Sequence, residues 1–393
     1  MSILKPLDQI KEEDIKNLIV NCAREQRTIE YKEGLPGGSD EDKREFLADV
    51  SSFANASGGD LIYGIKEKRD ASGATTGEPE SIKPLTVNPD TETRRLEQII
   101  QAGIEPRMPG VHVLFASLSA GGHIAVIRIP KSWAGLHMVT FKNLSRFFSR
   151  NSGGKYQLDV SEIRTGFVAA ESGLDRIRRF RLERVAKILS NEGPVYMENG
   201  AKAILHLVPL SSLDSGNECD FQDLPANEPQ AIATSGYGRE YNFDGLVSHT
   251  ARGREPASSY IQIFRNGAIE SCAGQLFDDH KKFVASLLFE RKLIEATRSY
   301  LGALKTLRIP EPALLFLSVA GIQGYTMAVP SDYFVYDPVR IREESLLCPE
   351  IRIESFDDDP AVILHSTFNR IWNAVGIERS MYYDATGKWI GHR

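Results

Sequence analysis

The residues best suited to chemistry lie in the segment Glu25-Gln-Arg-Thr-Ile-Glu30-Tyr-Lys32. Two carboxylates five residues apart point to different sides of one continuous helix or strand. They converge only if a helix ends between them, so we expect Glu25 just past a helix and Glu30 within a strand. The alternation of side chains along that strand places Lys32 on the same face as Glu30.

A third acid, Glu67, follows a buried strand predicted over residues 60–65. If this strand neighbours the one that carries Glu30, the three carboxylates meet at one end of a sheet. Carboxylates tolerate such closeness by holding a hard cation such as Mg²⁺ or Mn²⁺. The cation can ionise a water for attack on phosphorus, and Lys32 can neutralise charge on the pentacovalent phosphate. The alternative is three surface acids, each paired with a neighbouring base.

The charge distribution favours a phosphate-rich partner despite a formal net charge of −6. Residues 107–191 carry 14 Lys/Arg against 5 Asp/Glu, whereas residues 193–393 carry 19 against 26. A local basic face is what phosphate binding requires, because each cation that neutralises a phosphate releases a counterion. The second half is acidic, and a partner-binding sensor is therefore a further alternative.

Two groups of arginines are candidates for nucleic-acid contact. Arg146 and Arg150 lie on a predicted strand with two phenylalanines between them, which suits backbone contact and base stacking. A predicted helix over 171–190 is rich in arginine, and its candidate contacts are Arg178, Arg179 and Arg181. The alternatives are that at least one phenylalanine belongs to the core and that the helix is a solvated face whose arginines pair with nearby acids.

Periodicity and turn signals predict the elements that position these residues. Ser39 or Asp40 can cap a helix that ends before Gly58-Gly59, where the glycine pair serves as a helix C-cap or lets a phosphate approach the backbone. The other predicted elements are helices over 8–23 and 91–104, strands over 28–32, 60–65, 111–115, 123–129, 137–141 and 146–150, and a charged turn over 66–70.

The chain therefore reads as an α+β protein with a mixed-sheet N-terminal domain and a second α+β domain. We expect boundaries at 1–168 for the first domain, 169–192 for a basic connector helix and 193–393 for the second. The second domain contains predicted strands and helices but no motif that indicates a role. Before the helix predicted over 361–375, the acids 357–359 are better explained as an N-terminal cap than as a calcium loop.

Several classes of protein lack support in the sequence. No apolar stretch approaches the roughly 18 residues of a membrane span, and the N-terminus does not read as a secretory signal, so we expect a cytoplasmic protein without a membrane partner. The cysteines and histidines lack the spacing of zinc, redox or histidine-based metal sites. No phosphate-binding GxxxxGK[ST] loop occurs, so nucleotide binding has no basis in the sequence.

Five motifs in order resemble the AlbA_2 domain of Schlafen proteins, over residues 21–165. The resemblance implies a fold linked to metal-dependent cleavage of structured RNA, particularly tRNA. These motifs are Glu25-x4-Glu30-Tyr-Lys32, the helix end Val50-Ser-Ser-Phe-Ala-Asn-Ala-Ser-Gly-Gly59, the strand Leu61-Ile-Tyr-Gly-Ile65, Ile129-Pro-Lys-Ser132 with His137, and Arg146-Phe-Phe-Ser-Arg150.

In the family's acidic trio, Glu25 and Glu30 match the first two positions, and Glu67 stands by position for the third, where an aspartate is usual. Many bacterial relatives resemble regulators with DNA-binding or ATPase attachments. We therefore expect a nucleic-acid-binding protein that is a Mg²⁺- or Mn²⁺-dependent endoribonuclease, with a non-catalytic DNA- or RNA-binding transcriptional regulator as the alternative. The expected partners are tRNA-like RNA or DNA, and a homodimer is compatible with such a domain.

Overall fold

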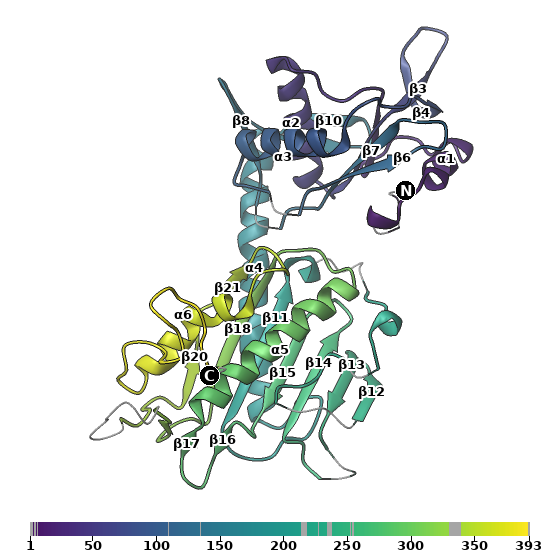
Figure 1. The fold of residues 1–393 in the computed structure, drawn as a ribbon. Coiled ribbons are helices and arrows are strands. Elements are labelled where there is room, and N and C mark those ends of the chain that lie inside the picture. The colour runs from purple at the N-terminus through teal and green to yellow at the C-terminus, as the bar shows by residue number, and fades with distance from the viewer. Residues whose placement is uncertain are drawn as a thin grey trace. The chain divides into compact units, whose positions relative to one another are not determined.

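The computed structural model describes residues 3, 5, 7–108, 110–133, 135–213, 218–226, 228–233, 238–251, 253, 255–329 and 339–391. The chain divides into two compact units, Met1–Leu174 and Asp175–Arg393 (Figure 1). Helices combine with several mixed and antiparallel sheets, which confirms the predicted α+β class. None of the helices in these described ranges is long and apolar enough to cross a membrane.

The first sheet of unit 1 has the strand order β1-β2-β7-β6. Strand β1 runs parallel to β2, with Ile29 opposite Asp60 and Lys32 opposite Tyr63, so the condition on which the meeting of the three acids depended is met. The remaining pairs are antiparallel. The strand bounds are Ile29–Lys32 for β1, Gly59–Tyr63 for β2, His112–Ser117 for β6 and His123–Ile129 for β7.

The side chains of β1 alternate between two environments. Ile29 and Tyr31 are fully buried in a hydrophobic cluster with α1 (Glu12–Val20), whereas Glu30 and Lys32 are half-buried on the opposite face. That opposite face of the sheet is covered by α2 (Asp40–Ala54). Alternation therefore places the polar residues of β1 toward α2, as the sequence pattern predicts.

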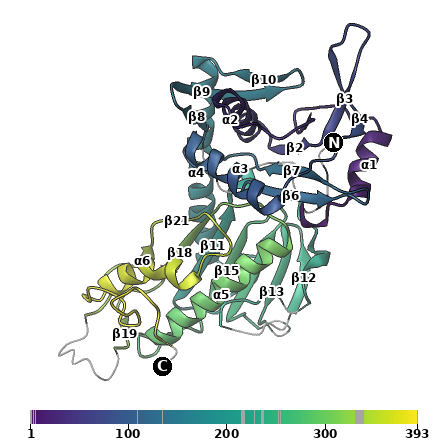
Figure 2. The same ribbon diagram turned by 45° about the horizontal axis from the view of Figure 1, so that its top comes forward.

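Helix α2 packs between the first sheet and a second, antiparallel sheet of order β10-β9-β8-β5 (Figure 2). It begins at Ser39, whose side chain accepts a hydrogen bond from the backbone N–H of Asp42, so the predicted cap is confirmed. The elements around it are α3 (Pro89–Gly103), β5 (Ile104–Glu105), β8 (Met138–Phe141), β9 (Leu144–Asn151) and β10 (Gly154–Gln157).

The prediction of a charged turn over residues 66–70 is wrong. These residues belong to β3 (Ile65–Arg69), which pairs with β4 (Thr75–Ile82) in a hairpin with an exposed tip, and the turn lies over 70–74. Ion pairs of Lys66 with Glu80 and of Lys68 with Glu78 run across the two strands. Glu67 therefore lies inside a strand, at a point where the register shifts on both sides.

Unit 2 contains one antiparallel eight-stranded sheet of order β12-β13-β14-β15-β11-β18-β20, with β21 also paired to β18. Helices α5 (Ser286–Thr306) and α6 (Pro360–Asn373) pack in the larger hydrophobic cluster. The C-terminal part of α4 (Val160–Leu189) packs in a separate cluster with residues of β11, β13, β14 and β15. The strand bounds are β11 (Lys202–Pro209), β12 (Gly238–Asn242), β13 (Gly245–His249), β14 (Ser259–Phe264), β15 (Ile269–Ala273), β18 (Ala313–Ala320), β20 (Ser345–Leu347) and β21 (Ile351–Ile353).

A smaller sheet in unit 2 is formed by β16 (Phe277–Asp278), β17 (Phe283–Val284) and β19 (Thr326–Met327). Helix α4 contains the boundary between the units, since unit 1 ends at Leu174 and unit 2 begins at Asp175. Helix α4 begins well before the connector predicted over 169–192, so those residues are not a separate element. Asp359 accepts a hydrogen bond from the N–H of Ala361, which confirms the predicted acidic cap of α6.

Candidate nucleic-acid site

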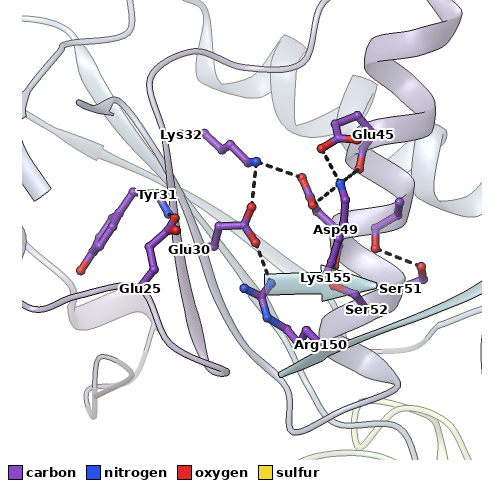
Figure 3. Close-up of polar contacts among 11 residues, drawn as sticks. Glu25, Glu30, Tyr31, Lys32, Glu45, Asp49, Ser51, Ser52, Arg150 and Lys155 are labelled. Atoms are coloured by element: carbon purple, nitrogen blue, oxygen red, sulfur yellow. Dashed lines mark hydrogen bonds and ion pairs between the residues drawn. The ribbon is translucent and has the colours of Figure 1, made fainter. Parts of the chain in front are cut away.

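Glu30 is held between two cations on the face of β1 that points toward α2 (Figure 3). One carboxylate oxygen accepts a bond from Lys32 Nζ at 2.7 Å and the other from Arg150 at 2.7 Å. Burial alone raises the pKa of Glu30, but Lys32 and Arg150 outweigh it and lower that pKa below its usual value. Glu30 is therefore a carboxylate with both oxygens engaged.

Glu25 lies five residues beyond the end of α1, outside the helix as the spacing predicts. Its carboxylate accepts a hydrogen bond from the backbone N–H of Tyr31 at 2.7 Å. Burial raises the pKa of Glu25 to about 7, and the charges of Glu67 and Glu30 add to the shift. Glu25 therefore lies within electrostatic reach of both other acids of the trio.

Glu67 approaches the same region from β3. Its Oε2 atom is buried and has no hydrogen-bond partner among the described residues. Burial raises the pKa of Glu67, the charge of Glu30 acts in the same direction, and the N–H of Gly77 and the Lys32 ammonium oppose them. An unpartnered buried carboxylate oxygen is costly, so it favours a ligand at this point.

The three carboxylates differ in how well they fit a divalent cation. Carboxylate oxygens are suitable donors for Mg²⁺ or Mn²⁺, and Glu67 Oε2 is free to act as one. Lys32 and Arg150, however, compete for Glu30. Within the described residues, no group of three or more His, Cys, Asp or Glu side chains is arranged to hold a metal ion.

Asp49 and Lys155 belong to the same network and were not among the residues selected from the sequence. Asp49, in α2, is 1% exposed and accepts a bond from Lys155 Nζ at 2.7 Å, while Lys32 Nζ lies 3.5 Å from its other oxygen. Burial raises the pKa of Asp49 to about 6, and the charge of Glu30 adds to this. The signal in the sequence is an aspartate on the apolar stripe that also contains Phe46 and Phe53.

The two candidate strand arginines have different environments. Arg146 is exposed and donates to the side chain of Gln157 at 2.6 Å, so its guanidinium reaches solvent. Arg150 is only 3% exposed and lies over the ring of Phe53, 3.7 Å from its centroid. The structure therefore makes Arg150 an internal partner of Glu30 rather than an exposed phosphate contact.

The three candidate arginines of α4 also separate. Arg179 is exposed, and Arg178 is exposed but paired with Glu350 and Asp175. Arg181 is 8% exposed and donates to Ser318 Oγ and to the carbonyl oxygens of residues 317 and 348. Its guanidinium stabilises the packing of α4 within unit 2 and is not placed where a phosphate could reach it.

The glycine pair after α2 is explained by close packing of the backbone. A Cβ atom on Gly59, at φ 150°, would lie 2.3 Å from the carbonyl oxygen of Thr28, and one on Gly58 would lie 2.6 Å from the N–H of Lys131. Asn55 accepts a bond from the N–H of His137 and donates to the carbonyls of His137 and Phe148. These residues fix the end of α2 to the strands that carry the site.

Comparison with known proteins supports the assignment of unit 1. Residues 25–159 match the family described as Schlafen, AlbA_2, a range that includes all three acids of the trio. The matched range is about a third of the chain, and the match supports nucleic-acid binding in general. No curated protein is similar enough in sequence to count as a relative.

Among the solved structures that match parts of the chain are two with 20% identity each. The DIP2311 protein from Corynebacterium diphtheriae aligns over 38% of this chain and 26% of its own length, with a TM-score of 0.25. The N-terminal domain of a protein from Nitrosomonas europaea, described as related to the ATP-dependent DNA helicase RecG, aligns over 30% of this chain and 72% of its own, with a TM-score of 0.23. This chain thus spans about a quarter of the Corynebacterium protein.

Proposed function

We propose that unit 1 binds structured RNA, of which tRNA is an example, and cleaves its phosphodiester backbone with the help of Mg²⁺ or Mn²⁺. The observation that carries this proposal is the buried Oε2 of Glu67, which has no hydrogen-bond partner among the described residues. The carboxyl group of Glu67 also interacts electrostatically with those of Glu25 and Glu30. A buried carboxylate oxygen without a hydrogen-bond partner is suited to a cation.

The residues of the chain divide the chemical work. In this proposal Glu25, Glu30 and Glu67 hold the cation after they move closer together and Glu30 exchanges Lys32 or Arg150 for it, because the described arrangement is not itself a metal site. A bound cation would lower the pKa of a water and stabilise the leaving oxygen. Lys32 is one-third exposed and carries its ammonium beside Glu30, so it can neutralise charge that develops on the phosphate. Arg150 holds Glu30 from the interior and fixes its orientation.

The test uses purified full-length protein, labelled tRNA, and either Mg²⁺ or Mn²⁺. The wild type should cut and lose activity in EDTA, and Glu30→Ala should abolish cutting because it removes a carboxylate of the trio. Glu33→Ala is the matched control, since Glu33 is an exposed acid just beyond β1 that pairs with Lys83. If Glu30→Ala cuts as fast as Glu33→Ala, the nuclease assignment is wrong.

A second candidate function is non-catalytic binding of RNA or DNA by a transcriptional regulator. The observation that favours it is the engagement of both Glu30 oxygens by Lys32 and Arg150, which already neutralises the central acid of the trio. In the same assay a regulator retards the labelled nucleic acid but leaves it intact with either cation. Parallel lanes with duplex DNA then separate the two polymers.

A further inference from the structure

Glu30 and five neighbouring side chains form a chain of alternating charge that extends beyond the carboxylate trio (Figure 3). Its order is Arg150, Glu30, Lys32, Asp49, Lys155 and Glu45. These groups come from β1, α2, β9 and β10 and meet near one face of α2. The network thus joins β1, which carries an acid of the proposed cleavage site, to a strand of the second sheet.

Exposure divides this network into an inner and an outer part. The side chains of Asp49 and Arg150 are each 2% exposed, whereas those of Lys32 and Lys155 are 33% and 20% exposed. The two ammonium groups that approach one Asp49 carboxylate are therefore the cations that solvent can reach. Glu45, at 60% exposed, is the outermost partner of Lys155.

Asp49 is a buried aspartate on the apolar face of α2, a position that an apolar residue usually occupies. Its removal from water costs free energy, and an apolar side chain of similar volume at such a position is often as stable or more so. Asp49 hydrogen-bonds Lys155 at 2.7 Å and forms a looser ion pair of 3.5 Å with Lys32, whose closer partner is Glu30. It thereby restrains two flexible lysines, which would otherwise lose conformational freedom when they engage a ligand. Two held ammonium groups beside each other match the repeated negative charge of a nucleic-acid backbone.

We propose that Asp49 is a positioning residue that holds Lys32 and Lys155 as a paired contact for the backbone phosphates of bound nucleic acid. This inference rests on the proposed nucleic-acid-binding function. Exposed Glu45 is the contact that an incoming phosphate replaces at Lys155, since the carboxylate and the phosphate compete for the same ammonium group. The buried Asp49 stays in place beneath both lysines.

The comparison of Asp49→Asn with Glu45→Gln tests the proposal. Each change removes one negative charge near Lys155, and general electrostatics therefore predicts tighter binding of tRNA for both. Positioning predicts opposite results: Glu45→Gln binds at least as tightly as the wild type, whereas Asp49→Asn binds more weakly. Binding is measured in EDTA, where no cutting occurs. The plot of log K against log salt should become less steep for Asp49→Asn, its slope decreasing in magnitude by about one or more.

The salt slope distinguishes positioning from a loss of fold. A variant whose folded fraction is reduced but constant across the salt series, as checked by circular dichroism, has a lower apparent affinity at every salt concentration and an unchanged slope. Weaker binding by Asp49→Asn with a wild-type slope therefore overturns the proposal, and so does binding equal to that of Glu45→Gln. If the wild type binds neither tRNA nor duplex DNA, the proposed function itself fails.

A second pair of variants covers the case in which Asp49→Asn does not fold. Lys155→Met should lower the salt slope by about one. Lys142→Met, which removes an exposed lysine of unit 1 that pairs with Asp40, should leave the slope unchanged. Equal slopes for these two variants overturn the proposal without any measurement on Asp49. Where Asp49→Asn does fold, adding Lys155→Met to it should lower the slope less than Lys155→Met does alone.

Discussion

Glu25 is half-buried and Glu270 is fully buried, yet it is the pKa of Glu25 that rises and that of Glu270 that falls. Glu25 has a backbone N–H as its hydrogen-bond partner, and burial raises its pKa to about 7. Glu270 accepts two bonds of 2.7 Å from Arg184 and one of 3.1 Å from His206. These bonds outweigh burial and lower the pKa of Glu270 to about 2. The hydrogen-bond partner, rather than the depth of burial, decides the direction of the pKa shift.

The lowered pKa of Glu270 predicts a loss of stability in acid. An unfolded chain has a glutamate pKa near 4.3, so the ionised form stabilises unit 2 fully above that value and progressively less as the pH falls toward 2. The free energy of unfolding of unit 2, measured in urea between pH 2 and pH 7, should therefore fall most steeply below about pH 4.3.

Glu270→Gln is the variant that isolates this effect. It should lower stability at pH 7 by about 3 kcal/mol or more, because Arg184 is left buried without its carboxylate. Its stability should also change less than that of the wild type between pH 4.3 and pH 2. A variant whose acid dependence parallels the wild type would assign the acid sensitivity to other groups.

At the residue scale, sequence could select the acids proposed for the site but not their partners. Glu25, Glu30 and Lys32 stand close together in the chain, so spacing and strand alternation suffice to select them. Asp49 and Lys155 are 106 residues apart, and no local pattern pairs them. Arg150 was selected for its type, but the ring of Phe53 and the carboxylate of Glu30 hold it inside the protein.

At the element scale, the junction between α2 and β1 decides where the carboxylates lie. Gly59 begins β2 next to Thr28, and there is no room there for a Cβ atom. Gly59→Ala should push β1 away from β2 and cost about 1–3 kcal/mol or more, since the conformation and the contact are both unfavourable. Because Glu30 is displaced with β1, the variant should also lose cutting activity.

Gly38→Ala is the control for this prediction, because a Cβ atom at Gly38 meets nothing within 4 Å. Stability is measured by urea unfolding and activity by cleavage of labelled tRNA. A Gly59→Ala protein as stable as Gly38→Ala would show that the strand can move without cost.

Elements with a strong local signal were predicted well, and those that depend on distant pairing were not. The cap at Ser39 and the apolar stripe of α2 are determined by residues close together in the sequence. The run 66–70 looks like a turn because it is highly charged, but it becomes β3 by pairing with β4, whose ion pairs accommodate the charge. Glu67 was consequently placed beyond a sheet end instead of inside a hairpin.

Helix α4 provides a test of which arginines contact nucleic acid. Arg179→Ala should reduce the salt slope of tRNA binding by about one if this exposed side chain contacts phosphate. Arg181→Ala should leave the slope unchanged and destabilise unit 2, since it removes four hydrogen bonds to β18 and to Cys348. A reduced slope for Arg181→Ala would contradict the internal placement of its guanidinium.

At the scale of the whole molecule, the hydrophobic clusters of the described residues each lie within one unit. Two belong to unit 1 and two to unit 2, and none combines residues of both. Independent cores are the physical basis of separate cooperative transitions. We therefore expect the chain to unfold in two steps rather than one.

Tryptophan fluorescence can assign the two steps, because Trp133 is in unit 1 and Trp372 and Trp389 are in unit 2. A Trp133→Phe protein should report the unfolding of unit 2 alone. In that background Arg181→Ala should lower the urea midpoint, whereas Gly59→Ala should leave it unchanged because its clash lies wholly within unit 1. If Gly59→Ala lowers the midpoint of unit 2 as far as Arg181→Ala does, the two cores are energetically coupled, and the proposed nuclease unit should not be studied apart from the rest of the chain.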